Sequence, residues 1–125
     1  MDRLQHIFEL QANLDEEIRA GHRLPEGDLS TWIQKEALAI IVELGELLEE
    51  VNFKWWKVPR PLNREAIKEE LVDILHFFIS MCLKAGISAE ELYQAYLTKN
   101  EENFRRQRGL SKEGYAPKGG EEENE

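Results

Sequence analysis

The feature that most constrains the fold is a helical spacing of apolar residues that recurs in four long segments of the chain. It is clearest in the second segment, where the apolar residues return every three or four positions: Ile33, Ala37, Ile40, Ile41, Leu44, Leu47, Leu48 and Val51. This spacing places them on one face of an α-helix, whereas a strand would alternate apolar and polar residues. No such alternation is visible, so we expect an all-α fold.

Glycine, proline and capping residues set the bounds of the four segments. The predicted helices span about residues 2–20, 28–57, 63–86 and 88–108. Asp28 or Ser30 can cap the second helix and Asn63 the third, and Gly86 ends the third as a C′ residue. The stretch "SAEE" from Ser88 matches a capping box, which opens the fourth helix.

Short connections between long helices favour an antiparallel bundle of these four helices. The second and third helices carry apolar residues beyond a single stripe, which indicates burial on more than one side. We therefore expect a homodimer, in which a second copy covers the additional apolar surface.

The chain of 125 residues is expected to form one domain over residues 1–108, followed by a flexible segment over 109–125. Residues 109–115 have the glycine and polar content of a lid that closes over a substrate. Residues 116–125 contain "GGEEENE", in which glycine and like charges favour disorder.

Charge and composition exclude several classes of protein. A formal net charge of −9 argues against nucleic-acid binding, which needs a basic surface. Cys82 is the only cysteine, so neither an intrachain disulfide nor a cysteine zinc site is expected. The N-terminus lacks a signal-peptide pattern, and no apolar run reaches the roughly 20 residues of a membrane span. We expect a cytoplasmic protein without a membrane or nucleic-acid partner.

Acidic residues border the apolar stripes of the second and third helices. At about 100° per residue, Glu36, Glu43, Glu46 and Glu50 fall within a quarter turn of one another, beside Leu47. Glu70 and Asp73 are three residues apart and share a face of the next helix. Like charges along a half-buried edge repel one another, and a divalent cation would compensate them. The four carboxylates of Glu43, Glu46, Glu70 and Asp73, with no thiolate among them, suit Mg²⁺, with Mn²⁺ as a substitute.

The same acids have a simpler interpretation as charges that face solvent. Pairs of the form Glu-x-x-Glu occur by chance on many acidic amphipathic helices. Two such pairs on successive helices, both beside the apolar stripe, favour the metal site.

These motifs resemble a known family. Glu43-x-x-Glu46, followed by Glu70-x-x-Asp73 in "EELVDILHF", looks like the metal motif of the all-α nucleotide pyrophosphatase (MazG-like) superfamily. Together with "VELGELLEEVNFKWWK" and "KNEENFRRQRGLSKEGY", it resembles the dimeric all-α dUTPases over about residues 4–115.

The resemblance implies roles for further residues. Gln11 and Asp15 match a pair that recognises uracil, although many relatives carry Asn at the second position, and Trp55 matches a tryptophan that contacts uracil. His76 matches a residue of the deoxyribose pocket. Four residues on the C-terminal side of the chain match substrate-binding positions of the family: Lys99, Asn103, Arg106 and Tyr115. In the family the Lys and the Arg contact the phosphates, and the Asn lies near the uracil.

The chemistry of these residues is consistent with the implied roles. Trp55 lies between lysines, so that an aromatic plane adjoins positive charge. Lys99, Asn103 and Arg106 are spaced by four and three residues and so share one side of a helix. Each feature is also common on an ordinary helix surface or at the end of a bundle.

The resemblance implies Mg²⁺-dependent hydrolysis of dUTP to dUMP and pyrophosphate, with dUDP as a further candidate substrate. Glu43, Glu46, Glu70 and Asp73 would hold the metal, and Glu46 is our choice of catalytic base, with Glu43 beside it.

Three alternatives stay open at this stage. The first is a broader nucleotide pyrophosphatase that acts on other or damaged nucleotides. The second is a di-iron protein, which needs two Glu-x-x-His motifs where only Asp73-x-x-His76 approximates one. The third is a non-catalytic interaction module.

Overall fold

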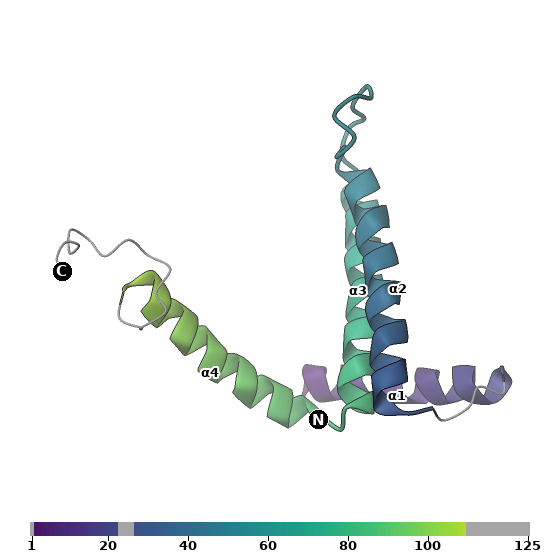
Figure 1. Cartoon of the computed structure of the whole chain (residues 1–125), viewed down its shortest axis with the longest axis vertical. Coiled ribbons are helices and arrows are strands. Elements are labelled where there is room, and N and C mark those ends of the chain that lie inside the picture. Colours follow the sequence, from purple (N-terminus) through teal and green to yellow (C-terminus); the bar gives the residue numbers. More distant parts are fainter. Residues whose placement is uncertain (1, 23–26, 110–125) are drawn as a thin grey trace. The chain divides into compact units, whose positions relative to one another are not determined.

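The computed structural model describes residues 2–22 and 27–109, and in these ranges the chain forms four helices and no strand (Figure 1). The helices are α1 (Arg3–Gly21), α2 (Leu29–Glu50), α3 (Arg64–Lys84) and α4 (Ala89–Gln107). The all-α class is therefore confirmed. The chain divides into two compact units, of which the first (Met1–Ser88) holds α1, α2 and α3 and the second holds α4.

Side-chain caps explain where the first three helices begin. Asp2, Asp28 and Asn63 each accept a hydrogen bond from the backbone N–H three residues further on, at 2.8, 2.7 and 3.1 Å. Such caps satisfy an N–H group that the helix itself leaves unpaired. Asp28 is thus the cap of α2 rather than Ser30. Gly86 follows α3 with a φ of 76°, as expected for a C′ glycine.

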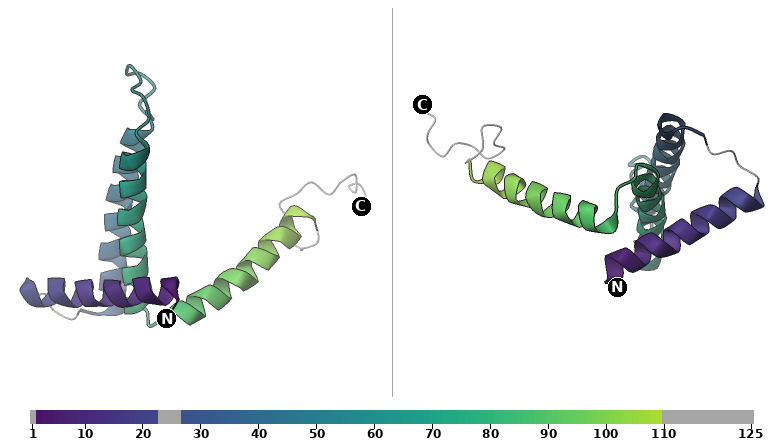
Figure 2. Two further views of the ribbon diagram at one scale, coloured as in Figure 1. Left: turned by 180° about the vertical axis from the view of Figure 1, so that it is seen from behind. Right: turned by 90° about the horizontal axis from the view of Figure 1, so that it is seen from below.

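Helices α2 and α3 form an antiparallel hairpin, and α1 crosses it. The two views of Figure 2 place α1 across the end of the hairpin where α2 begins and α3 ends. Phe8 of α1 and Ile79 and Cys82 of α3 are buried in this first unit. The antiparallel arrangement is thus seen in α2 and α3, while α1 lies across them.

Much of the apolar surface of the hairpin is uncovered within the first unit. Leu38, Ile41 and Val42 of α2 are 62%, 61% and 59% exposed, and Leu71 and Val72 of α3 are also exposed. Contiguous apolar surface of this kind is typical of protein–protein interfaces. The homodimer stays a prediction, and this surface is the one that it would cover.

The loop between α2 and α3 begins earlier than the sequence indicates. We expected α2 to reach the tryptophans, but it ends at Glu50, and Asn52 has a φ of 60°. The amide of Asn52 binds the backbone N–H and C=O of Arg60, both at 2.9 Å, and so closes the loop. Trp55 and Trp56 therefore lie in the loop, with their rings edge to face at 5.3 Å.

The second unit presents α4 alone among the described residues. The predicted lid and acidic tail lie beyond the described part of the chain, apart from Gly109. Within residues 2–22 and 27–109, no single helix is long and apolar enough to cross a membrane. Helices α3 and α4 together meet these criteria only across the break between them.

Candidate metal and nucleotide site

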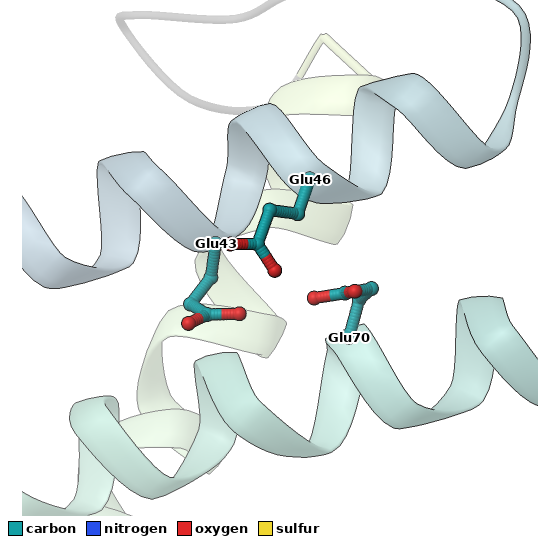
Figure 3. Close-up of side chains that lie close together, drawn as sticks. All are labelled: Glu43, Glu46 and Glu70. Atoms are coloured by element: carbon teal, nitrogen blue, oxygen red, sulfur yellow. The ribbon is translucent and has the colours of Figure 1, made fainter.

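Three of the four predicted metal ligands meet between α2 and α3. Glu43 and Glu46 are one turn apart on α2 and point toward Glu70, which projects from α3 (Figure 3). One carboxylate oxygen from each lies within 4.8 Å of the others. Three carboxylates at this separation can act as ligands of a single cation.

The cluster is unfavourable while all three acids are charged and unpaired. Glu43 Oε1 and Glu70 Oε1 are buried and have no hydrogen-bond partner in the described part of the chain. Desolvation raises the pKa of Glu70 to about 7, assisted by a hydrogen bond with Glu43 and by the charges of Glu46, Glu43 and Asp73. A cation would satisfy the unpaired oxygens and favour the charged form. An all-oxygen donor set suits Mg²⁺ or Mn²⁺, so the residues present fit this metal.

The fourth predicted ligand, Asp73, lies one turn after Glu70 on α3 and outside the group of three. It lines, together with Glu43, a neighbouring cavity of about 870 Å³. Asp73 therefore stands where the acid cluster opens into this cavity, a position from which it can serve a metal or a ligand.

The wall of the cavity contains a chain of hydrogen bonds from α3 to α1. His76 Nδ1 lies 2.5 Å from Gln11 Oε1, and Gln11 Nε2 donates to Asp15 Oδ1 at 2.8 Å. Because the amide nitrogen of Gln11 already donates to Asp15, its oxygen is the acceptor. The proton of a neutral His76 therefore resides on Nδ1 and leaves Nε2 as an acceptor.

The chain continues to α2 and to the end of α3. Ser80 Oγ lies 2.7 Å from Asp15 Oδ2 and 2.6 Å from Glu36 Oε2. Lys84 Nζ donates to Glu36 Oε2 and, at 2.8 Å, to Ser80 Oγ. The same ammonium lies 5.0 Å from the centre of the Trp32 ring, a cation–π distance. All five residues line the cavity, which thus has charged, polar and aromatic walls.

The comparison with known families covers both the acid cluster and all the residues that line the cavity. A family model described as dUTPase matches residues 3–87, which is more than half of the chain. The chain belongs to the dUTPase family. The resemblance inferred from the acidic motifs together with the tryptophan segment and the C-terminal motif is therefore confirmed.

Curated phage proteins are also similar to this dUTPase-family chain. A dCTP pyrophosphatase of Enterobacteria phage T4 is 32% identical over 105 residues, covering 65% of the chain and 61% of the relative. A dCTP pyrophosphatase of Enterobacteria phage LZ5 is 38% identical over 74 residues, covering 59% and 43%. A DNA replication protein of phage T4 is 31% identical over 98 residues, covering 59% and 25%. The chain thus spans less than two thirds of the length of these relatives. No solved structure matches it.

Some of the residues that the dUTPase resemblance assigned to the base and sugar line the cavity, and one does not. Gln11, Asp15 and His76 line it and are joined by hydrogen bonds. Trp55 does not line it and is 85% exposed on the loop between α2 and α3. Its contact with a base stays a prediction.

The C-terminal set of predicted ligands lies on the other unit of the chain. Lys99, Asn103 and Arg106 are all on α4, and Arg106 Nε is paired with Glu102 at 3.2 Å on the same helix. Tyr115 lies outside the residues that the structure describes. The contacts of these four residues with a nucleotide stay predictions.

The residues that sequence reasoning missed include four of the polar and aromatic wall described above: Trp32, Glu36, Ser80 and Lys84. A signal for two of them was present, since Ser80 and Lys84 follow His76 at intervals of four and so share its face of α3. Glu36 was placed in the acidic stripe of α2, but no role in the site was predicted for it. Trp32 carries no signal that distinguishes it from a core residue.

Proposed function

We propose that this protein hydrolyses a pyrimidine 2′-deoxynucleoside triphosphate to its monophosphate and pyrophosphate, with Mg²⁺ as cofactor. The observation that carries the proposal is the acid cluster of Glu43, Glu46 and Glu70. One oxygen each of Glu43 and Glu70 is buried and unpaired among the described residues, and Glu43 also lines the cavity with polar walls. Membership of the dUTPase family supports the same reaction.

The different exposure of the acids supports a division of roles among them. Glu43 and Glu70 are half-buried, whereas Glu46 is exposed, so Glu46 is the member that reaches solvent water. We assign it as the base that accepts the proton of the attacking water at its carboxylate. The water oxygen bonds to the α-phosphorus while the bond to the β-phosphate bridge breaks, and pyrophosphate leaves. Mg²⁺, held by Glu43, Glu46 and Glu70 with Asp73 beside them, would supply electrostatic stabilisation of the phosphate charge.

Two bases are candidates for the substrate. Uracil follows from the sequence resemblance, which predicts dUTP as the substrate and dUDP as a further one. Cytosine is favoured by the phage relatives, two of which bear the name dCTP pyrophosphatase. Gln11, Asp15 and His76 supply hydrogen-bonding groups that suit a pyrimidine edge of either kind.

We further propose that the active form is a homodimer. The exposed apolar side chains of α2 and α3 support it, because the first unit by itself leaves them uncovered. A second copy that packs on the hairpin would cover them and hold the two helices that carry the acids.

The test is pyrophosphate release from each deoxynucleoside triphosphate in the presence of Mg²⁺. We expect turnover of a pyrimidine substrate, and a loss of roughly 10²-fold or more in Glu43→Gln, the scale on which a charge-stabilising group is felt. Glu17→Gln, an exposed charge-matched change on α1, should leave the rate unchanged. No release from any nucleotide, with no effect of Mg²⁺ on the melting temperature, would instead indicate a non-catalytic interaction module.

A further inference from the structure

One end of the cavity contains a buried carboxylate that lacks a donor. Glu36 lines the cavity, is only 7% exposed, and its Oε1 has no hydrogen-bond partner among residues 2–22 and 27–109. A buried acceptor without a donor costs free energy, so such a group in a cavity wall is suited to a ligand that donates to it.

Neighbouring side chains do not supply enough donors. The Ser80 hydroxyl has one proton but lies within hydrogen-bond distance of two carboxylate oxygens, Asp15 Oδ2 and Glu36 Oε2. It can donate to only one of them at a time. Lys84 serves Glu36 Oε2 and Ser80, and its Nζ stands 3.7 Å from Asp15 Oδ2. Among these four side chains, Glu36 Oε1 is therefore left without a donor.

The formal charges of Asp15, Glu36 and Lys84 also favour a ligand that donates hydrogen bonds. Within the described residues, Asp15 and Glu36 both pair with the ammonium of Lys84, and these three groups together carry one formal negative charge in excess. The amide of Gln11 does not change the balance, since it donates to Asp15 Oδ1 and accepts from His76. A ligand group that carries N–H donors, without a carbonyl oxygen beside them, complements this wall.

The position of Glu36 suits the base of a nucleotide whose phosphates lie at the acid cluster. Glu36 precedes Glu43 by seven residues on α2, two turns or about 10 Å along the helix axis. This separation is on the scale of a nucleoside, and both glutamates line the same cavity. The aromatic ring of Trp32, one turn before Glu36, adds a wall for a base near the same end.

Resting on the proposed function, we propose that Glu36 selects cytosine over uracil by accepting a hydrogen bond from the 4-amino group of dCTP. Cytosine presents two N–H donors at this position, and a carboxylate is the acceptor that pairs with such an amino group. Uracil presents its O4 carbonyl there, which would place an acceptor against an acceptor.

The proposal predicts selectivity that depends on the amino group itself. We expect kcat/KM for dCTP to exceed that for dUTP by about tenfold or more, the scale of one specific base contact. A third substrate, the pyrimidin-2-one deoxynucleoside triphosphate, is dCTP without the 4-amino group. It should lose a similar factor.

Glu36→Gln tests the residue, with Glu17→Gln as the charge-matched control. The glutamine amide can donate to the O4 of uracil, so the ratio of kcat/KM for dCTP to that for dUTP should fall about tenfold. Glu17→Gln should keep the ratios of the wild-type protein.

The outcomes separate this proposal from the hydrolytic function. Equal or better turnover of dUTP by the wild-type protein, or an equal loss for all three substrates in Glu36→Gln, would overturn the role of Glu36. If Glu36→Gln does not fold, the wild-type ratio of dCTP to the pyrimidin-2-one analogue decides. If no nucleotide is hydrolysed, the proposed function fails, and calorimetric binding of dCMP against dUMP still tests the base pocket. Tighter binding of dCMP supports it, and equal binding overturns it.

Discussion

Binding of Mg²⁺ should release a proton from Glu70. The pKa of this carboxyl group is raised from 4.5 to about 7, first by desolvation and then by its neighbours Glu43, Glu46 and Asp73. A metal ligand must be deprotonated, so protons and metal compete for the same oxygens. The perturbation is a change of pH across this pKa, with Glu70→Gln as the variant that removes the titrating group.

The magnitude follows from the raised pKa. A group with a pKa of about 7 is roughly 90% protonated at about pH 6 and roughly 10% protonated at about pH 8. Mg²⁺ should therefore release about 0.9 proton at the lower pH and about 0.1 at the higher. Its apparent affinity should rise about tenfold between them.

The stability of the metal-free protein should fall as pH rises, whereas the affinity for Mg²⁺ should rise. Because the pKa of Glu70 is higher in the folded than in the unfolded chain, the folded chain binds more protons between pH 4.5 and about 7. The free energy of unfolding of the metal-free protein should then fall as pH rises through this window. Glu70→Gln should remove this dependence.

Isothermal titration calorimetry in two buffers with different ionisation enthalpies measures both the affinity and the number of protons released. Glu69→Gln, an exposed change at the adjacent position, serves as the control and should behave as the wild type. The reasoning is refuted if Mg²⁺ binds equally well at both pH values. Binding without proton release at the lower pH would refute it as well.

Three further changes test other parts of the molecule. Lys84→Met removes the ammonium from Glu36 and should lower the free energy of unfolding by about 1 to 3 kcal/mol. The loss should be smaller than for a wholly buried pair because a quarter of the lysine side chain is exposed. An unchanged midpoint of chemical denaturation would show that this ion pair does not stabilise the fold. Trp55→Ala should raise KM and weaken the choice between dUTP, dTTP and dCTP if the ring contacts the base, whereas Trp56→Ala should affect mainly stability; unchanged selectivity in Trp55→Ala would rule out the contact. Leu38→Glu places a charge on the exposed face of α2 and should yield a monomer in analytical ultracentrifugation, and a variant with the assembly state of the wild type would show that this face is not the interface.

The fold was largely predictable because local signals agree with one another. Caps at Asp28 and Asn63 and the stop at Gly86 lie where the apolar periodicity begins or ends. The exception is the end of α2. There the helix stops because Asn52 binds the backbone of Arg60, eight residues away, and no pattern within the helix encodes that contact.

The candidate site was predictable where it depends on spacing along one helix. Glu43 and Glu46 share a face of α2, and Glu70 could be placed opposite once two adjacent helices were expected. The base end of the cavity could not be derived in this way, because it needs α1 to cross the hairpin. Only this crossing brings Asp15 to Ser80, a pair 65 positions apart.

The crossing of α1 over α3 has a consequence for motion. Gln11 and Asp15 connect α1 to His76 and Ser80 through side chains that also form the cavity wall. A ligand that bridges this wall would fasten α1 to the hairpin, while an empty cavity leaves the attachment to a few polar bonds and the packing of Phe8. Amide hydrogens of the first helix would then exchange more slowly once the cavity is filled, so that occupancy could be followed at a distance from the phosphates.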